Sequence, residues 1–84
     1  MTRDDAHTLL ATVLHGIAPE VDLDALDPDE PFQQEADIDS MDFLNLVIGL
    51  HDESGIDIPE DDYQKLSTLA DILTYLQERV DSRA

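Results

Sequence analysis

The chain has 84 residues and no cysteine, and its four basic residues face 21 acidic ones, for a formal net charge of −17. This length predicts one small domain, residues 1–84, and the missing cysteines exclude disulfides, thiolate metal sites and a thiol nucleophile. So acidic a surface repels nucleic acid and anionic membranes and favours partners with basic patches. The chain is 42% hydrophobic with periodic apolar residues, which argues against disorder.

No stretch approaches the ~20 apolar residues that a membrane span needs. The absence of cysteine suits a reducing compartment, and Asp4 and Asp5 argue against a secretory or organellar leader. We therefore expect a cytoplasmic monomer that neither inserts into membranes nor binds nucleic acid.

The first predicted helix ends near residue 17, where Gly16 and Pro19 interrupt the pattern. Its apolar face is Leu9, Leu10, Val13, Leu14 and Ile17. Residues 19–38 contain three prolines and many aspartates, so we expect a long loop. The residues available to hold this loop on the core are Val21, Leu23, Leu26 and Phe32.

A second helix is expected from about Ser40 to Glu53, ended by residues 54–55, and a short turn or helix begins at Pro59. The last helix starts at a Thr68 cap, with Asp71 three positions later. Its predicted buried face is Leu69, Ile72, Leu73, Leu76 and Val80. The fold class is therefore all-α: a small four-helix bundle, with three main helices plus one short helix and a long loop between helices 1 and 2.

The second helix has two apolar faces, one more than a small bundle needs. At about 100° per residue, one face holds Phe43, Leu46, Val47 and Leu50. The other, the apolar stripe, is Met41, Leu44 and Ile48. The stripe either packs under a neighbouring segment or contacts a partner, because exposed apolar patches often mark interfaces.

Ser40 opens this helix, directly after Asp39, which is a good N-cap with Asp42 three residues later. The first-turn amides and the positive end of the helix dipole favour an anion here. The serine is therefore either an ordinary capping residue or a place where a phosphate can be attached.

The Asp-Ser-Met-Asp sequence at residues 39–42 resembles the phosphopantetheine attachment motif of acyl carrier proteins. The resemblance continues through "IAPEVDLDALDPDEPF" before it and "SGIDIPEDDYQKLSTLADILTYL" after it, and so covers nearly the whole chain. It implies that a phosphopantetheinyl transferase attaches 4′-phosphopantetheine from coenzyme A to Ser40. The protein would then be no enzyme, but a carrier of acyl groups as thioesters.

The resemblance also makes the second helix the recognition surface for acyl-loading and acyl-processing enzymes with basic docking patches. Its expected contact residues are Asp39, Met41, Asp42, Leu44, Asn45, Ile48, His51 and Asp52. Fatty-acid-synthesis carriers commonly have glutamate where this chain has Asn45 and His51. This departure favours a dedicated polyketide, peptide-type or specialised lipid pathway over housekeeping fatty acid biosynthesis.

An alternative is an unmodified adaptor module, in which Ser40 only caps the helix. A calcium loop opening at Asp37 mismatches three of the five loop positions compared, and the three histidines lack metal-binding spacing, so no metal site is expected. Tyr63 and Tyr75 are expected to be packing residues. Gly49, in the middle of the second helix, suggests room for part of an acyl chain between helices.

Overall fold

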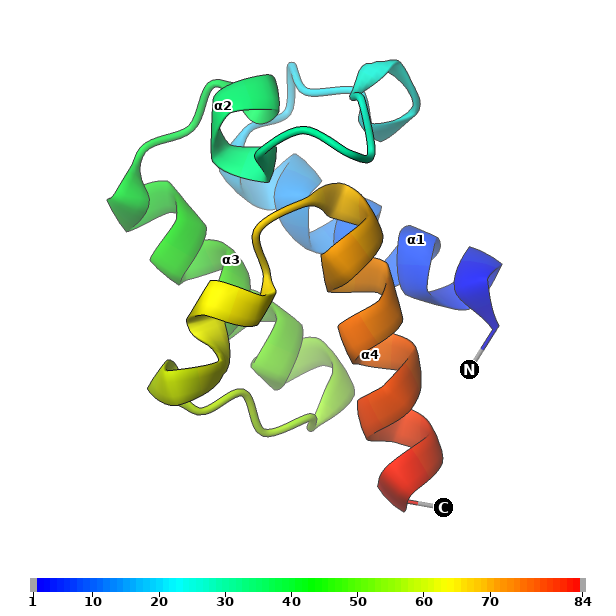
Figure 1. Cartoon of the computed structure of the whole chain (residues 1–84). Helices are drawn as coiled ribbons and strands as arrows, with labels where there is room; N and C mark the ends of the chain where they lie inside the picture. The colour runs from blue at the N-terminus through cyan, green and yellow to red at the C-terminus, as the bar shows by residue number, and fades with distance from the viewer. Residues whose placement is uncertain (1, 84) are drawn as a thin grey trace.

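The computed structural model describes residues 2–83, with side chains described as far as residue 79. Three helices of 15 residues form the bundle: α1 (Arg3–Ile17), α3 (Ser40–Ser54) and α4 (Leu69–Arg83) (Figure 1). Shorter helices lie between them: the 3₁₀ helix η1 (Leu23–Ala25), α2 (Phe32–Ala36) and the 3₁₀ helix η2 (Glu60–Lys65). The predicted all-α bundle is confirmed, and residues 2–83 form no strand beyond one isolated bridge between Pro31 and Thr68.

The ends of the long helices lie where local sequence predicts them. Thr2 and Asp5 form a reciprocal capping box at the start of α1. Thr68 caps α4 as predicted, because its hydroxyl accepts a hydrogen bond of 3.0 Å from the Asp71 amide. Gly55 ends α3 with φ at 74°, a left-handed conformation that glycine adopts without strain.

The core lies between α1, α3 and α4. The buried side chains of α4 are Leu69, Ile72, Leu73, Tyr75 and Leu76, and those of α3 are Phe43, Leu46, Val47 and Leu50. These are the predicted faces, with Tyr75 buried and Tyr63 half-buried, while the Val80 side chain lies outside the described residues.

The close contact between α1 and α3 corrects the expectation at Gly49. A Cβ atom at this position would lie 2.5 Å from Cγ1 of Val13, far inside van der Waals contact. Glycine therefore lets the two helices approach each other, and Val13 fills the space that we expected to remain for an acyl chain.

The linker between α1 and α3 is more ordered than the predicted loop, since it contains η1 and α2. Both helices are too short to show a periodic pattern in the sequence. The Phe32 amide donates to the Ser67 carbonyl (2.7 Å) and the Ala70 amide to the Pro28 carbonyl (3.1 Å), which ties the linker to the start of α4. Leu23 and Phe32 are buried, and Val21 and Leu26 pack against the core, as predicted.

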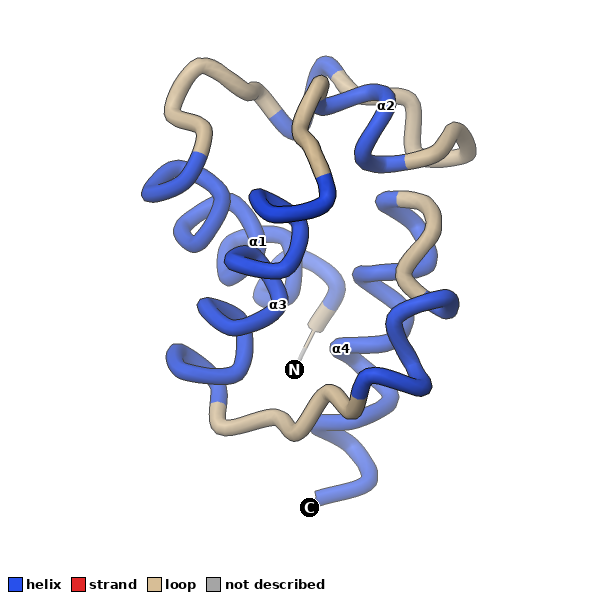
Figure 2. The backbone as a smooth tube through the Cα atoms, turned by 90° about the vertical axis from the view of Figure 1, so that its left-hand side faces the viewer, coloured by secondary structure: helices blue, strands red, loops and turns tan. Residues whose placement is uncertain are grey.

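The linker crosses one end of the bundle and residues 55–59 cross the other (Figure 1 and Figure 2). Between these crossings, α3 has α1 on one side and η2 on the other, which leaves its N-terminal end and one face available. No helix within residues 2–83 has both the length and the apolar character to cross a membrane.

Candidate functional site: the N-terminal end and exposed face of α3

The start of α3 is fixed by its cap. Asp39 has an extended backbone, and its carboxylate accepts a hydrogen bond of 2.8 Å from the Asp42 amide. The cap is therefore Asp39, and Ser40 is the first residue of the helix, with an exposed side chain. Its hydroxyl lies at the positive end of a 15-residue helix, where an attached phosphate is favoured by the helix dipole.

The chain approaches Ser40 through a turn that the sequence did not reveal. Asp37 adopts a left-handed conformation, with φ at 55°, and ends α2. Ile38 is buried, and its amide donates to the Gln33 carbonyl at 3.1 Å. The segment before the serine is thus held by the core on one side and by α2 on the other.

The apolar stripe of α3 is uncovered. Met41 is 65% exposed, Ile48 48% and Leu44 39%, while the opposite face of the same helix is buried. Of the two alternatives for this stripe, packing under a neighbouring segment is therefore wrong for this chain. Three large apolar side chains in a row on one helix remain accessible to a partner.

The predicted polar contact residues flank the stripe on both sides. Asn45 and Asp52 are exposed and line a shallow hollow between α3 and α1, beside Gly49. His51 is on the other flank, facing residues 56–59, with its Nδ1 2.9 Å from the Ile56 carbonyl and 3.7 Å from the Asp57 carboxylate. Asp39 is exposed and Asp42 half-buried at the N-terminal end. All eight predicted contact residues therefore share one end or one face of α3.

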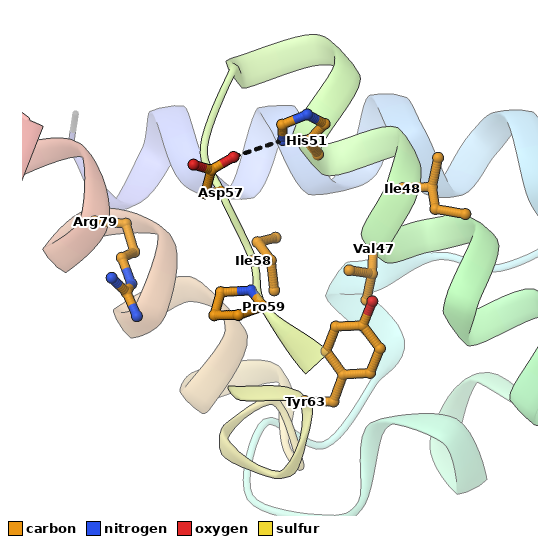
Figure 3. Close-up of a pocket in the computed structure, with 8 residues that line it drawn as sticks. All are labelled: Val47, Ile48, His51, Asp57, Ile58, Pro59, Tyr63 and Arg79. Atoms are coloured by element: carbon orange, nitrogen blue, oxygen red, sulfur yellow. Dashed lines mark ion pairs between the residues drawn. The ribbon is translucent and has the colours of Figure 1, made fainter. Parts of the chain in front are cut away.

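Two grooves lie on the η2 side of α3: a distal one between α3 and residues 57–63, and a proximal one between α2 and η2. The distal groove has a volume of about 570 Å³ and an apolar lining that includes Val47, Ile48 and Ile58, with His51 and Arg79 at its edge (Figure 3). The proximal groove, of about 410 Å³, takes Phe43 from α3 and glutamine side chains from α2 and η2.

A family model described as the phosphopantetheine attachment site matches residues 7–76, which include Ser40 and the whole of α3. The chain belongs to this family. Among its relatives, the acyl carrier protein of Lactobacillus johnsonii is 40% identical over 57 residues, which are 68% of this chain and 71% of that protein. The acyl carrier protein of Thermosynechococcus vestitus is 32% identical over 60 residues, 71% of this chain and 74% of that protein.

Members of this family are carriers and not catalysts, and their cofactor is covalently attached 4′-phosphopantetheine. In general they work with a phosphopantetheinyl transferase and with biosynthetic enzymes. An exposed serine hydroxyl at a helix N-terminus fits such a group, because the helix amides favour the phosphate and no neighbouring side chain covers the hydroxyl.

Among the described side chains, Asp62 is a buried carboxylate, and it belongs to a cluster that sequence analysis missed. Asp62 on η2 is 7% exposed, and it accepts hydrogen bonds from the Tyr75 hydroxyl (2.6 Å) and from the Arg79 guanidinium. Lys65 lies 3.2 Å from its other oxygen. The Lys65 spacing is visible in the sequence, but Tyr75 and Arg79 are 13 and 17 positions from Asp62, so only the fold brings them together.

The electrostatics of this cluster follow from its contacts. The hydrogen bond from Tyr75, helped by Lys65 and Arg79 and opposed by burial, holds the pKa of Asp62 below its usual range. Burial, together with the hydrogen bond to Asp62, raises the pKa of Tyr75 to about 12. The cluster joins η2 to α4, and Arg79 also lies over the Tyr75 ring, 5.0 Å from its centre.

The histidines make other contacts. His7 lies 3.2 Å from the Asp24 carboxylate, which places α1 beside η1, and His15 is exposed. Within the described part of the chain, no group of three or more histidine, aspartate or glutamate side chains is placed to hold a metal ion.

Proposed function

We propose that this protein is a discrete acyl carrier protein in which Ser40 carries the 4′-phosphopantetheine arm. The observation that carries the proposal is an exposed serine as the first residue of α3, inside the matched family region. The capping role is filled by Asp39, which removes the structural reason for the alternative of an unmodified adaptor in which Ser40 is only a cap.

The chain supplies the attachment point. Ser40 Oγ forms a bond to the phosphorus next to the pantetheine of coenzyme A and loses its proton, while the pyrophosphate bond breaks and adenosine 3′,5′-bisphosphate leaves. The transferase catalyses this step, since among the described residues no side chain is hydrogen-bonded to the Ser40 hydroxyl and placed to accept its proton. The arm supplies the thiol that this cysteine-free chain lacks, and acyl groups are held on it as thioesters.

The apolar stripe and its flanking acids form the proposed docking surface for the transferase and for acyl-loading and acyl-processing enzymes. Met41, Leu44 and Ile48 would enter a shallow apolar pocket of the partner. Asp39, Asp42 and Asp52 would meet its basic rim, with Asn45 and His51 at the edges. Exposed ion pairs contribute only about 0–1 kcal/mol each and are screened by salt, so binding should be brief and salt-sensitive.

The carried acyl group is proposed to shelter in part beside α3, in the proximal groove on the η2 side. Support comes from the volume of this groove, about 410 Å³, and from Phe43 and Leu66 in its lining. On loading an acyl group, we expect NMR shifts at α2 and η2, which line this groove. Shifts confined to the surroundings of Ser40 would contradict this part of the proposal.

The cargo is proposed to belong to a dedicated polyketide, peptide-type or specialised lipid pathway, because Asn45 and His51 make the recognition face less acidic than in fatty-acid-synthesis carriers. A monomer in the cytoplasm completes the proposal. The missing cysteines support that compartment, and the charge of −17 supports the monomer through self-repulsion.

Incubation with coenzyme A and a broad-specificity phosphopantetheinyl transferase tests the proposal, with intact mass as the measurement. We expect the wild type to gain one arm and Ser40→Ala to gain none. Ser67→Ala is the matched control, because Ser67 is also exposed but lies in the connection before α4, and it should gain one arm like the wild type. A wild type that stays bare, or a Ser40→Ala variant that is modified equally, overturns the carrier function.

A further inference from the structure

The two grooves beside α3 share a single lining residue, Tyr63 of η2. The proximal groove takes Phe43 from α3, three residues after Ser40, and the distal groove takes Val47 and Ile48 about one turn further on. Phe43 and Val47 are about 6 Å apart along the helix axis, at 1.5 Å per residue. A group that moves from the proximal groove into the distal groove therefore has to pass Tyr63, the lining residue that the two share.

The Tyr63 ring stands across that route. It is half-buried, and in Figure 3 it is directed toward α3 with its hydroxyl on the side of Val47. The distal groove, with Ile48, Ile58 and Pro59, lies beyond it. The ring is thus a wall common to two spaces that would otherwise form one trench along α3.

The backbone that carries this ring is anchored on both sides. Asp62, the preceding residue, is bound to Tyr75 and Arg79 of α4, and its amide donates to the Pro59 carbonyl at 2.9 Å. On the other side, Leu66 is buried, and its amide donates to the Tyr63 carbonyl at 3.0 Å. The buried Asp62 cluster therefore positions the ring, and moving the ring aside means disturbing these contacts.

The two spaces also differ in what they offer an alkyl chain. The proximal groove has three amide side chains in its lining, those of Gln33, Gln34 and Gln64. The distal groove is larger, at about 570 against 410 Å³, and its lining includes the aliphatic side chains of Val47, Ile48 and Ile58. An alkyl tail that enters the distal groove buries further methylenes against these aliphatic side chains, each worth about 0.8 kcal/mol in apolar surroundings.

We propose that Tyr63 is a partition that determines cargo specificity: the carrier shelters short acyl groups on the Ser40 side of the ring and leaves longer alkyl tails exposed. This inference rests on the proposed function. Asp62, Tyr75 and Arg79 are positioning residues that hold the partition in place.

The test is the rate at which hydroxylamine cleaves the thioester, releasing the acyl group as its hydroxamate and leaving the free thiol, followed by intact mass. Wild type, Tyr63→Phe and Tyr63→Ala are each loaded with acetyl, butyryl, hexanoyl, octanoyl and decanoyl groups. Tyr63→Phe keeps the ring and is the matched control. In wild type and Tyr63→Phe, we expect the protection of the thioester from cleavage to stop increasing at short chain lengths. In Tyr63→Ala, we expect protection to keep increasing with chain length, by up to about fourfold for each further methylene that is buried.

Equal rates for Tyr63→Ala and Tyr63→Phe at every chain length overturn the partition, as does a wild type whose protection keeps growing with length. Tyr63→Leu, with an intermediate volume, should fall between the two and carries the test if Tyr63→Ala loses helicity by circular dichroism. The mass before acyl loading separates the two proposals: without an arm the carrier function fails, whereas with an arm and unchanged rates only the partition fails.

Discussion

The two flanks of α3 are built in opposite ways. On the α1 side, Gly49 and Val13 bring two helices into direct contact, with only a shallow surface hollow of about 320 Å³ beside them. On the η2 side, a 3₁₀ helix packs less closely and leaves two grooves. A long helix docks along its whole length, while a six-residue 3₁₀ helix contacts its neighbours at a few points and depends on polar anchors such as Asp62. The close contact on the α1 side stabilises the bundle, and the grooves on the η2 side leave space for a bound group.

Adding a side-chain atom at the contact between α1 and α3 should have the largest effect on stability. Gly49→Ala places a methyl group against Val13, so we expect the free energy of unfolding to fall by about 1–3 kcal/mol in chemical denaturation. Gly16→Ala, in α1 with no atom within 4 Å of the new Cβ, is the control and should be neutral or stabilising by up to about 1 kcal/mol. Val13→Ala should rescue Gly49→Ala; equal effects of the two glycine variants would contradict the close contact.

The hydrogen bond between Tyr75 and Asp62, which joins η2 to α4, should be lost at high pH. Burial and the hydrogen bond to Asp62 raise the pKa of Tyr75 from 10.0 to about 12, so between these values the unfolded chain releases a proton that the folded chain keeps. The free energy of unfolding should therefore fall as the pH rises from 10 to 12, by on the order of 2 kcal/mol.

Denaturation curves of wild type and Tyr75→Phe across this pH range measure the effect. The variant keeps Tyr63 but lacks the titrating group, so its stability should fall less steeply than that of the wild type. An equal loss of stability between pH 10 and 12 in the two proteins would refute the assignment of this pH dependence to Tyr75.

At the N-terminal end of α3, substitutions of the adjacent residues Asp39 and Ser40 should have different effects on stability. Asp39→Ala removes the hydrogen bond to the Asp42 amide, so we expect a loss of about 1 kcal/mol in thermal or chemical unfolding. Ser40→Ala should stay within about 0.5 kcal/mol of the wild type. A larger loss for Ser40→Ala than for Asp39→Ala would restore the cap as the role of the serine.

The smallest expected effect concerns the acidic surface that both flanks share. Divalent cations should raise the melting temperature by on the order of a few degrees, because they reduce the repulsion within a chain of net charge −17. Sodium chloride at equal ionic strength is the control and should act more weakly. No rise, or a fall, in magnesium or calcium chloride would count against this prediction.

Local patterns in the sequence predicted the long helices, the caps at Asp39 and Thr68, and the two faces of α3, because each depends on residues within a few positions. They missed α2, since five residues are too few for a periodic signal. They also misjudged Gly49. A helical glycine can mark either free space or a close contact between helices, and the residue that faces it, here Val13, is distant in the sequence. The Asp62 cluster and the division of the grooves by Tyr63 depend on contacts between distant segments.

Ser40 and the apolar stripe belong to one uninterrupted helix, and this has a consequence for delivery. On the proposed function, the attachment point of the arm and the docking surface for partner enzymes move as one rigid body. A partner that binds the docking surface therefore also fixes the position from which the arm extends. Only rotations about the bonds of the arm itself remain to bring the thioester to the catalytic centre.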